Sequence, residues 1–365
     1  MAKRVIISGG GTGGHIFPAV AIANALKRVS PGIEILFVGA NGRMEMERVP
    51  AAGYKIIGLD IQGFQRKSLL KNLLLPYKLL MSLIRSRSII KEFKPDVAVG
   101  VGGYASGPLL YAASLMKVPY LIQEQNSYAG ITNKRLAKKA ALVCVAFNGM
   151  DKFFPAEKIL VTGNPIRKDT VDISGKREAA FNFFGLSPLK KTILVTGGSL
   201  GAGTLNKSML SGMDRIIAGD VQLIWQTGKH YFQSIQGQLA GKENENVKVL
   251  EFLQKMDLAY AAADVIISRA GAGTISELYV VKKPVILVPS PNVAEDHQTK
   301  NAMALVENDA AILVRDTEAE QGLVGVALQL LKDSAKCESL SQNIGKMALP
   351  DADEVIAMEV LKIAN

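Results

Sequence analysis

Short runs rich in valine and isoleucine recur along this chain, and each ends in a glycine-bearing turn that a helical pattern follows. Alternation of this kind builds a parallel sheet with helices on both faces. Such sheets bind ligands at the carboxyl ends of their strands. The sequence therefore predicts an α/β fold with a ligand site near the glycine turns. The clearest strand-like runs are residues 4–8, 35–38, 97–101, 192–196, 265–268 and 285–288.

The length of the chain and an internal sequence similarity both indicate two such sheets. Single cores stop growing at about 250 to 300 residues, and this chain has 365 residues. The segment VIISGGGTGGH at 5–15 is matched by ILVTGGSLGAG at 193–203, and each is a strand that runs into a glycine loop. The chain is therefore predicted to hold two domains, each built around its own parallel sheet.

The boundary between the domains is expected where the alternating pattern breaks. An Asn-Pro pair interrupts the run ILVTGNPIR at 159–167, and a proline disfavours helix at the residue before it. The polar stretch 168–176 is predicted to be the linker. We assign residues 1–165 to the first domain and 166–349 to the second.

Composition narrows the environment and the partners. Cys144 and Cys337 lie far apart and outside any CxxC spacing, which argues against a disulfide framework and favours a reducing cytoplasm. The first apolar run is too short for a signal peptide, and none approaches the roughly 20 residues that span a bilayer. The net charge of +10 favours an anionic partner. Nucleic acid is disfavoured, because aromatic residues are sparse and no nucleic-acid-binding motif is found.

The first glycine loop suits a phosphate group. Glycines stand at positions 9–11, 13 and 14, directly after the first strand, and Pro18 is expected to open the following helix. Glycine lets backbone N–H groups approach an anion, and a helix N-terminus adds about half a positive charge. The loop is predicted to bind a phosphate or pyrophosphate, although such loops also serve only to turn a strand into a helix.

Two familiar nucleotide fingerprints are missing from the sequence. A dinucleotide enzyme needs an acidic residue about 20 residues beyond the loop, at the end of the second strand. Here that strand ends FVGAN at 37–41, and the strand after the second loop ends IWQT at 224–227, so neither supplies the acid. A P-loop is excluded because neither loop carries the closing Gly-Lys-Ser/Thr.

A third glycine loop, SRAGAGT at 268–274, precedes the expected first turn of a helix. Glu277 lies on that turn, where its carboxylate can accept two hydrogen bonds from a ribose diol while the helix N-terminus faces the phosphates. The Thr-x-x-Glu spacing from Thr274 equally fits a capping box, in which Glu277 only stabilises the helix start.

A basic, leucine-rich stretch at 64–94 carries eight lysine or arginine residues against the single acid Glu92. Such a helical stretch suits the surface of an anionic membrane, with each basic residue contributing about 1 kcal/mol. The ordinary alternative is a buried crossover helix with a solvated basic face. Pro76 should kink or divide the segment. The basic residues are Arg66, Lys67, Lys71, Lys78, Arg85, Arg87, Lys91 and Lys94.

Seven motifs stand in order along the chain, namely GGGTGGHIFPA (9–19), GVGGYASGP (100–108), QEQNSYAGITNK (123–134), TGNPIR (162–167), GGSLGAGTLN (197–206), SRAGAGTISE (268–277) and VPSPNVAEDHQTKNA (288–302). In their number and order they resemble the MurG family of bacterial UDP-N-acetylglucosamine transferases. That family converts lipid I to lipid II in peptidoglycan synthesis, at the cytoplasmic face of the inner membrane. The resemblance runs from one end of the chain to the other.

The resemblance implies a GT-B fold, with two Rossmann-like domains facing a central cleft. The N-terminal domain would take the undecaprenyl-linked lipid I acceptor and associate with the membrane, and the C-terminal domain would take most of the UDP-GlcNAc. A last helix at about 350–365 would pack back on the first domain. The implied donor-binding residues are Arg167 and Ser199 near the pyrophosphate, Leu253 near the uracil, Thr274 and Glu277 at phosphate and ribose, Asn126 and Gln298 at the sugar, and Thr12, Gly13, Gly14, Ala272 and Gly273 along the site. The implied acceptor side comprises Gly10, Gly11, Tyr104 and Asn133.

Inverting transfer to the muramyl C4 hydroxyl of lipid I needs a base and stabilisation of the departing UDP. Helix N-termini and Arg167 can stabilise UDP in place of a metal, so we expect neither a metal nor any other cofactor. One D-x-D string occurs, at 351–353, but it follows Pro350 at the start of the last helix and fits helix capping.

Three histidines, His15, His230 and His297, all fall in predicted loops. His15 follows the first glycine loop, so it can face the cleft with a pKa near neutrality, as a general base requires. Alternatively it binds a phosphate or braces the loop. Glu124 is the second candidate base, although an acid flanked by two glutamines can equally order its loop. His297 is expected to shape the sugar pocket, and His230 to lie on the surface.

Two other functions remain open from the sequence. A UDP-sugar 2-epimerase shares the GT-B architecture but needs no lipid acceptor, and the basic stretch would then lack a purpose. The second alternative is a non-catalytic protein that binds a nucleotide-sugar and recruits other proteins to the membrane. The joint presence of His15, Asn126, Glu277 and Gln298 speaks against such a scaffold.

Overall fold

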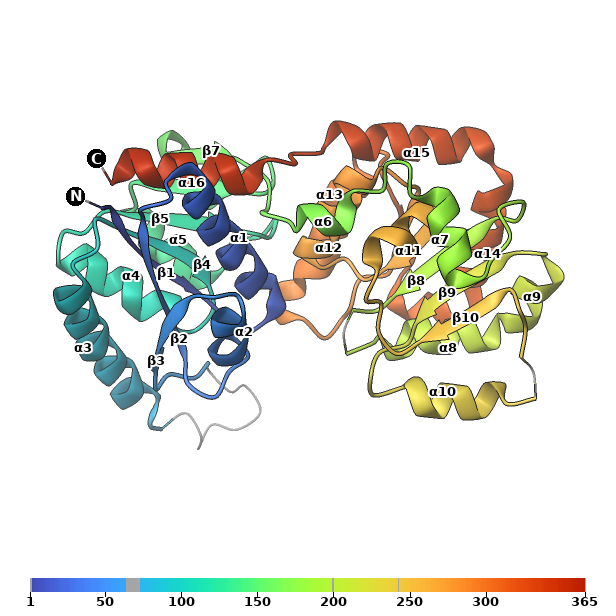
Figure 1. The fold of residues 1–365 in the computed structure, drawn as a ribbon, viewed down its shortest axis with the longest axis horizontal. Helices are drawn as coiled ribbons and strands as arrows, with labels where there is room; N and C mark the ends of the chain where they lie inside the picture. The colour runs from blue at the N-terminus through green and yellow to red at the C-terminus, as the bar shows by residue number, and fades with distance from the viewer. Residues whose placement is uncertain (1, 64–72, 199, 242, 365) are drawn as a thin grey trace. The chain divides into compact units, whose positions relative to one another are not determined.

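The computed structural model describes residues 2–63, 73–198, 200–241 and 243–364 (Figure 1). The chain divides into two compact units, each an α/β body with its own parallel sheet. Unit 1 comprises Met1–Ile166 and Leu349–Asn365, and unit 2 comprises Arg167–Ala348. The α/β fold class expected from the sequence is confirmed.

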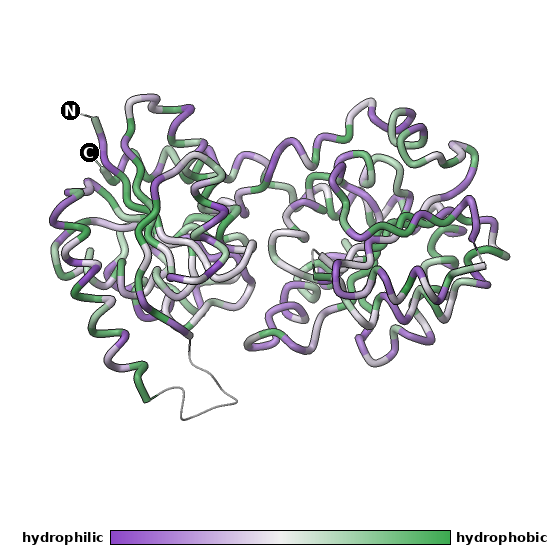
Figure 2. Tube along the Cα trace, turned by 60° about the horizontal axis from the view of Figure 1, so that its bottom comes forward, coloured by the Kyte–Doolittle hydropathy of each residue, from purple (hydrophilic) through white to green (hydrophobic). Residues whose placement is uncertain are grey.

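The described residues of unit 1 form a seven-stranded parallel sheet. Its strands are β1 (Arg4–Gly9), β2 (Glu34–Ala40), β3 (Lys55–Leu59), β4 (Val97–Gly102), β5 (Tyr120–Glu124), β6 (Leu142–Val145) and β7 (Ile159–Val161). Their order is β3-β2-β1-β4-β5-β6-β7, so β1 lies between β2 and β4. The central strands are buried and form the apolar centre of the unit (Figure 2), which explains their valine and isoleucine runs.

Helices cover both faces of this sheet. They are α1 (Gly13–Val29), α2 (Glu45–Ala51), α3 (Leu75–Phe93), α4 (Ser106–Leu115), α5 (Ile131–Ala137) and α16 (Ala352–Ile363), with short 3-10 turns at Met150–Lys152 and Ala156–Lys158. The last helix, α16, lies alongside α1 (Figure 1), where Arg28 pairs with Asp353 at 2.7 Å. The helices α3, α4 and α5 pack over the opposite face. No helix in the described ranges is both long and apolar enough to cross a bilayer.

Helix α1 begins earlier than the sequence predicted. Its first turn starts at Gly13, so Pro18 lies inside the helix and does not open it. A proline at this place cannot give the hydrogen bond that an N–H would donate to the Gly14 carbonyl. As a result His15 lies on a helical turn and not in a loop.

Unit 2 contains a six-stranded parallel sheet in its described part. Its strands are β8 (Thr192–Thr196), β9 (Gln222–Gln226), β10 (Val247–Leu250), β11 (Val265–Ser268), β12 (Val285–Leu287) and β13 (Ile312–Leu313). Their order is β10-β9-β8-β11-β12-β13, which places β8 in the middle as β1 is in unit 1. All six strand-like runs singled out in the sequence form strands of these two sheets.

The helices of unit 2 again cover both faces of a sheet. They are α6 (Lys168–Val171), α7 (Arg177–Phe184), α8 (Gly203–Ser211), α9 (Met213–Ala218), α10 (Phe232–Leu239), α11 (Met256–Ala262), α12 (Ala272–Val281), α13 (His297–Val306), α14 (Asp316–Lys332) and α15 (Ser334–Lys346), with a 3-10 turn at Ala294–Asp296. The expected linker at 168–176 is not found, because this stretch begins with α6, which packs against α11 and α12. His297 opens α13, so it too lies on a helix.

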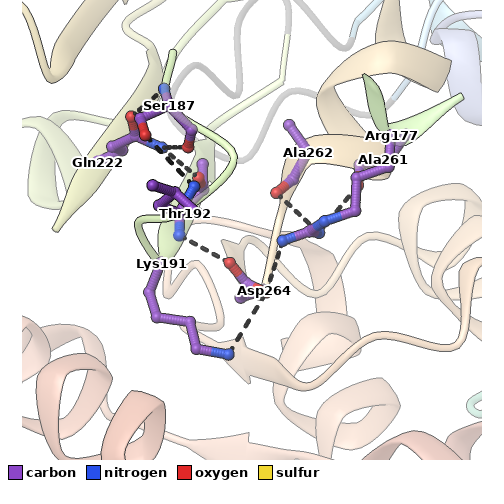
Figure 3. A network of polar contacts seen from close by, with 9 residues as sticks. Arg177, Ser187, Lys191, Thr192, Gln222, Ala261, Ala262 and Asp264 are labelled. Atoms are coloured by element: carbon purple, nitrogen blue, oxygen red, sulfur yellow. Dashed lines mark hydrogen bonds and ion pairs between the residues drawn. The ribbon is translucent and has the colours of Figure 1, made fainter. Parts of the chain in front are cut away.

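Polar contacts tie together the amino ends of three strands of unit 2 (Figure 3). Thr192, the first residue of β8, donates its backbone N–H to Asp264 Oδ2 at 2.8 Å, just before β11. Gln222, the first residue of β9, donates its amide to the Thr192 hydroxyl at 3.0 Å. Arg177 and Lys191 both pair with the Asp264 carboxylate. Side chains of the protein thus fill the side of the sheet where the strands begin. The glycine loops that could bind a ligand lie on the opposite side, at the carboxyl ends of the strands.

Candidate active site

Loops from three strands of unit 1 meet around His15, on the first turn of α1. Gly102, at the end of β4, packs against the imidazole ring, because a Cβ atom at this position would lie 2.7 Å from His15 Nδ1. Its φ of +105° is also one that residues with a side chain rarely adopt. Glycine at this position therefore makes room for the imidazole ring.

Gln125, directly after β5, holds the His15 ring. The Nδ1 atom of His15 lies 3.0 Å from Gln125 Oε1. Burial lowers the pKa of His15 below its usual 6.5, and it outweighs the opposing effects of Glu124, Gln125, the Val101 carbonyl and Glu45. His15 is therefore neutral at pH 7, which is the state that a general base requires.

Glu124, the alternative base, is buried and surrounded by donors from the loop that follows it. Its Oε1 accepts from the backbone N–H of Asn126 at 3.1 Å and from the Asn126 amide at 3.4 Å. Its Oε2 accepts from the Gly130 N–H at 3.0 Å and from the Asn133 amide at 2.9 Å. The carboxylate therefore orders this loop, which is the second role that the sequence left open for it.

The first glycine loop uses part of its backbone for internal contacts. Glu45, at the start of α2, is fully buried, and its carboxylate accepts from the Gly11 N–H at 2.8 Å and the Ala40 N–H at 3.0 Å. The Gly10 N–H is bonded to the Gly102 carbonyl at 3.3 Å. An anion at this loop is thus left with the N–H groups of Gly13 and Gly14 in the first turn of α1, because the His15 N–H is donated to the Thr12 carbonyl.

The other residues predicted in unit 1 differ in exposure. Tyr104 is 44% exposed, and the Arg43 guanidinium lies 5.6 Å from the centre of its ring. Asn133, in contrast, is buried and gives its amide to Glu124. Thr12 is the N-cap of α1 and accepts the His15 N–H at its carbonyl. Ligand contacts of these residues stay predictions.

In unit 2 a pocket of about 540 Å³ opens at the carboxyl ends of the strands. The glycine loop after β8 forms one wall, and the segments after β11 and β12 form another. Small-molecule sites commonly have about 300 to 1,000 Å³ of volume, so this pocket has the size of a ligand site. Its lining is Gly197, Gly198, Leu200, Gly201, Ala202, Gly203, Thr204, Tyr231, Arg269, Ser290, Asn292, Gln298 and Asp316.

An ion pair in the lining of this pocket joins its walls. Arg269, just after β11, pairs with Asp316, the first residue of α14, and both side chains are largely buried. The same guanidinium donates to the carbonyls of Val288 at 3.0 Å and Pro289 at 3.2 Å. The second Asp316 oxygen accepts from the Thr204 hydroxyl at 3.0 Å. Segments that follow three different strands are therefore fixed to one buried carboxylate.

Gln298, predicted at the sugar, lies in this lining. Its Oε1 accepts from the backbone N–H of Ser290 at 2.8 Å, which directs the amide NH₂ group away from that contact. The amide can then donate to a ligand oxygen, as sugar recognition requires. Ser199, predicted at the pyrophosphate, lies outside the described residues.

Glu277 lies on α12 beside Tyr260, whose hydroxyl donates to Glu277 Oε2 at 3.0 Å. Burial raises the pKa of Glu277, while the Tyr260 hydrogen bond and the Arg167 charge oppose that rise. Arg167 is thus close enough to act on Glu277, although neither belongs to the lining of the 540 Å³ pocket. The Tyr260 hydrogen bond uses one of the two carboxylate oxygens, and the contact of Glu277 with a ribose hydroxyl stays a prediction.

The capping box considered for Thr274 and Glu277 does not form. The N-cap of α12 is Gly271, without a side-chain cap, so Ala272, Gly273 and Thr274 make up the first turn. The backbone N–H groups of this turn are those that a helix leaves unpaired and that suit a phosphate. Glu277 therefore needs another role than capping.

Leu253 and the D-x-D string complete the predicted set. Leu253 follows β10 and is buried, whereas its neighbour Phe252 is 56% exposed. Asp351 is the N-cap of α16 without a side-chain cap bond, and Asp353 pairs with Arg28. Within the described residues, no group of three or more histidine, cysteine, aspartate or glutamate side chains could hold a metal.

Sequence reasoning missed four residues that shape these sites. Gln125 and Glu45 act through contacts between distant segments, and no local pattern marks them. Asp316 could have been found as an acid opening the helix after the last strand. Tyr260 has no signal in the sequence apart from its place on an otherwise alanine-rich helix.

Comparison with known families gives the same description for both units. Residues 5–145 match the glycosyltransferase family 28 N-terminal domain, and residues 192–356 match the glycosyltransferase family 28 C-terminal domain. A protein of Bacteroides fragilis is 60% identical over 366 residues, which cover 100% of this chain and 96% of that protein. It is named UDP-N-acetylglucosamine–N-acetylmuramyl-(pentapeptide) pyrophosphoryl-undecaprenol N-acetylglucosamine transferase.

Solved structures agree on the fold. The crystal structure of Acinetobacter baumannii MurG matches with a TM-score of 0.81 and 29% identity, over 99% of both chains. The UDP-GlcNAc 2-epimerase of Neisseria meningitidis, bound to UDP-GlcNAc, matches with a TM-score of 0.68 at 16% identity, over 99% of this chain and 100% of that one. The second match shows the shared GT-B architecture alone.

Proposed function

This chain belongs to glycosyltransferase family 28, and we propose that it transfers N-acetylglucosamine from UDP-GlcNAc to undecaprenyl-linked lipid I. The acceptor is the C4 hydroxyl of the muramyl sugar, and the product is lipid II of peptidoglycan synthesis. The observation that carries this function is the 60% identity, over the whole chain, to a relative named as this transferase.

Donor binding is supported by the geometry of unit 2. The pocket offers glycine amides and the N-terminus of α8 to an anion. Gln298, whose Oε1 is held by Ser290, keeps its amide NH₂ group for a sugar hydroxyl. Glu277 has one carboxylate oxygen for the ribose. These groups supply what a nucleotide-sugar needs, namely contacts for its phosphates, its ribose and its hexose.

The transfer is an inverting displacement at the anomeric carbon. A base removes the proton of the acceptor hydroxyl, the hydroxyl oxygen attacks C1, and the bond from C1 to the UDP oxygen breaks. His15 serves as that base, since its ring is neutral at pH 7 and Glu124 nearby favours the imidazolium that forms. Arg167 and the helix N-termini stabilise the departing UDP, so the enzyme works without a metal.

Peripheral association with the cytoplasmic face of the inner membrane is supported by α3 and the residues before it. Leu73, Leu74, Tyr77, Leu80 and Ile84 each expose more than half of their surface. Apolar and polar residues alternate along this helix (Figure 2). Exposed apolar side chains among basic ones suit an anionic lipid surface. The basic residues in the described part are Lys78, Arg85, Arg87, Lys91 and Lys94, whereas Arg66, Lys67 and Lys71 lie outside it.

The product itself tests this function. Purified protein is incubated with UDP-GlcNAc and a lipid I analogue, and the acceptor is examined by mass spectrometry. The mass of the acceptor should rise by one N-acetylhexosamine residue, with a β-linkage by NMR. An unchanged acceptor beside donor converted to its C2 epimer would replace the transferase with an epimerase.

A further inference from the structure

His15 has two ring nitrogens, and only the unprotonated one can take a proton from the acceptor. In neutral imidazole one nitrogen carries hydrogen and the other carries a lone pair, and the hydrogen bond of one decides the role of the other. The hydrogen-bond partner of His15 Nδ1 is therefore as important as the histidine itself. That partner is Gln125 Oε1, at 3.0 Å.

The orientation of the Gln125 amide is fixed by backbone carbonyls. Its Nε2 donates to the Val101 carbonyl at 2.6 Å and to the Gln123 carbonyl at 3.3 Å. A carbonyl has no hydrogen to give, so turning the amide over would set oxygen against oxygen at both contacts. Oε1 must therefore face His15, and it can only accept.

Two further amides extend this arrangement in the same direction. Gln123 accepts from Gln125 Nε2 through its Oε1 and donates its own Nε2 to Asn164 Oδ1 at 2.8 Å. Asn164 in turn donates its amide to the Gln125 backbone carbonyl at 3.0 Å. All three side chains are buried. This series of three side-chain amides is anchored on the backbone carbonyls of Val101 and Gln125, so none of the amides can turn over alone.

We propose that Gln125 is a positioning residue that keeps the proton of neutral His15 on Nδ1 and so leaves the lone pair on Nε2 to act as the base. The assignment of the base rests on the proposed function, whereas the protonation pattern rests on the hydrogen bonds alone. Gln125 holds the Nδ1 atom of His15, so Nε2 is the ring nitrogen that we assign to the acceptor hydroxyl.

Gln125 also suits the step that follows. When Nε2 takes the acceptor proton, the ring becomes imidazolium and Nδ1 keeps its hydrogen bond to a neutral amide oxygen. An amide stabilises the imidazolium less than a carboxylate would, so His15 stays neutral at pH 7 before the reaction. Glu124 and Glu45 supply the negative charges that act on the ring from nearby.

Nitrogen NMR tests the protonation pattern without any activity. The chain has three histidines, and the signals of His15 are assigned by their loss in His15→Ala. The ¹⁵N shifts of the folded wild-type protein at pH 8 should show a protonated Nδ1 and an unprotonated Nε2. A protonated Nε2 in the wild type would overturn the proposal. Apart from the assignment in His15→Ala, this measurement needs only the wild-type protein.

Two substitutions of buried glutamines distinguish a role of Gln125 in positioning the His15 proton from a role in packing. Gln125→Met removes the acceptor and should move His15 toward the Nε2-protonated form, whereas Gln123→Met leaves Gln125 anchored on two carbonyls and should not. A role in packing alone would affect both variants alike. An Nδ1-protonated His15 in folded Gln125→Met would contradict the proposal.

Kinetics add the link to the reaction. In Gln125→Met, kcat should fall by about 10-fold or more, because part of a general-base effect of 10²- to 10⁴-fold is lost, while KM for UDP-GlcNAc stays within about 2-fold. The acidic limb of the pH profile should move to lower pH, since the Gln125 hydrogen bond raises the pKa of His15. Exposed Gln238→Met is the control for kcat. If no transfer occurs while the ¹⁵N pattern is as expected, the proposed function fails and the tautomer assignment stands.

Discussion

The hydroxyl of Tyr260 donates to Glu277 Oε2 at 3.0 Å inside unit 2. Tyr260 is completely buried, and burial raises its own pKa well above 10. The tyrosine therefore stays protonated and acts only as a donor to Glu277. It fixes the carboxylate with one oxygen turned away from the tyrosine, and that oxygen is the one left for the proposed contact with ribose.

Glu277→Gln should weaken donor binding and stabilise the protein at pH 7. Burial raises the pKa of Glu277 above 4.5, so between the unfolded and folded values the folded state binds more protons. Stability contributed by this group is thus lost as pH rises through the folded pKa. Thermal unfolding should give a higher Tm for the variant at pH 7, with a difference that shrinks below pH 4.5.

Donor affinity is the second readout for Glu277→Gln. Loss of a charged hydrogen bond to ribose, of about 1.5 to 3 kcal/mol, should raise the Kd for UDP by about 10-fold or more in calorimetry. Glu318→Gln is the matched control, because Glu318 is exposed and forms only a surface pair with Arg315. Unchanged UDP affinity in Glu277→Gln would remove Glu277 from the site.

Asp316→Ala should destabilise unit 2 and open its pocket. It leaves the Arg269 guanidinium buried without its carboxylate, a loss of about 3 to 5 kcal/mol for a buried pair. In Arg269→Met with Asp316→Leu, stability should recover while donor affinity does not, since the loops lose their common anchor. Urea unfolding and UDP calorimetry measure the two effects. Full recovery of donor affinity in the double variant would make the pair a packing feature only.

Activity should fall on the acidic side with an apparent pKa below 6.5, because burial lowers the pKa of His15. His15→Ala should lose about 10²- to 10⁴-fold in kcat, the range for a general base. His230→Ala is the control, since His230 is exposed. The pH dependence of kcat/KM is the measurement, and a limb above 6.5 would not be that of His15.

Glu124→Gln distinguishes the two candidate bases. A glutamine places an NH₂ group where one carboxylate oxygen now accepts from two of the four donors, so the loop from Asn126 to Gly130 should loosen and the protein should unfold at lower urea. The acidic limb of the pH profile should persist, because His15 remains. Loss of that limb in folded Glu124→Gln would make Glu124 the base.

Vesicles of anionic phospholipid should retain the protein in flotation, and less so at high salt, because exposed charges are screened. Leu80→Ser with Ile84→Ser should weaken retention, since both side chains are exposed on α3. Leu189→Ser is the control, because Leu189 is 94% exposed but lies in unit 2. Equal retention of both variants would remove α3 from the membrane surface.

The strands and glycine loops could be predicted because they depend on local pattern. Valine and isoleucine runs marked β1, β2, β4, β8, β11 and β12. The start of α1 was missed because glycines at the first helical turn read as loop, while Pro18 reads as a beginning. The stretch at 168–176 read as a linker because its polar residues hide the contacts of α6 with α11 and α12.

The site residues divide in the same way. His15, Glu277 and Gln298 stand in recognisable motifs, so the sequence pointed to them. Gln125 and Asp316 matter through hydrogen bonds to segments far away in the chain, and such contacts exist only once the sheet is formed. The choice between His15 and Glu124 as base likewise depends on which side chain is already surrounded by donors.

The lipid-dependent transfer is measured as release of UDP from UDP-GlcNAc, with and without a lipid I analogue and in excess chelator. We expect UDP only when the acceptor is present, at a rate that the chelator leaves unchanged and that His15→Ala nearly abolishes. Release of UDP without acceptor, or binding of the donor with no release at all, would contradict a lipid-dependent, metal-independent transferase.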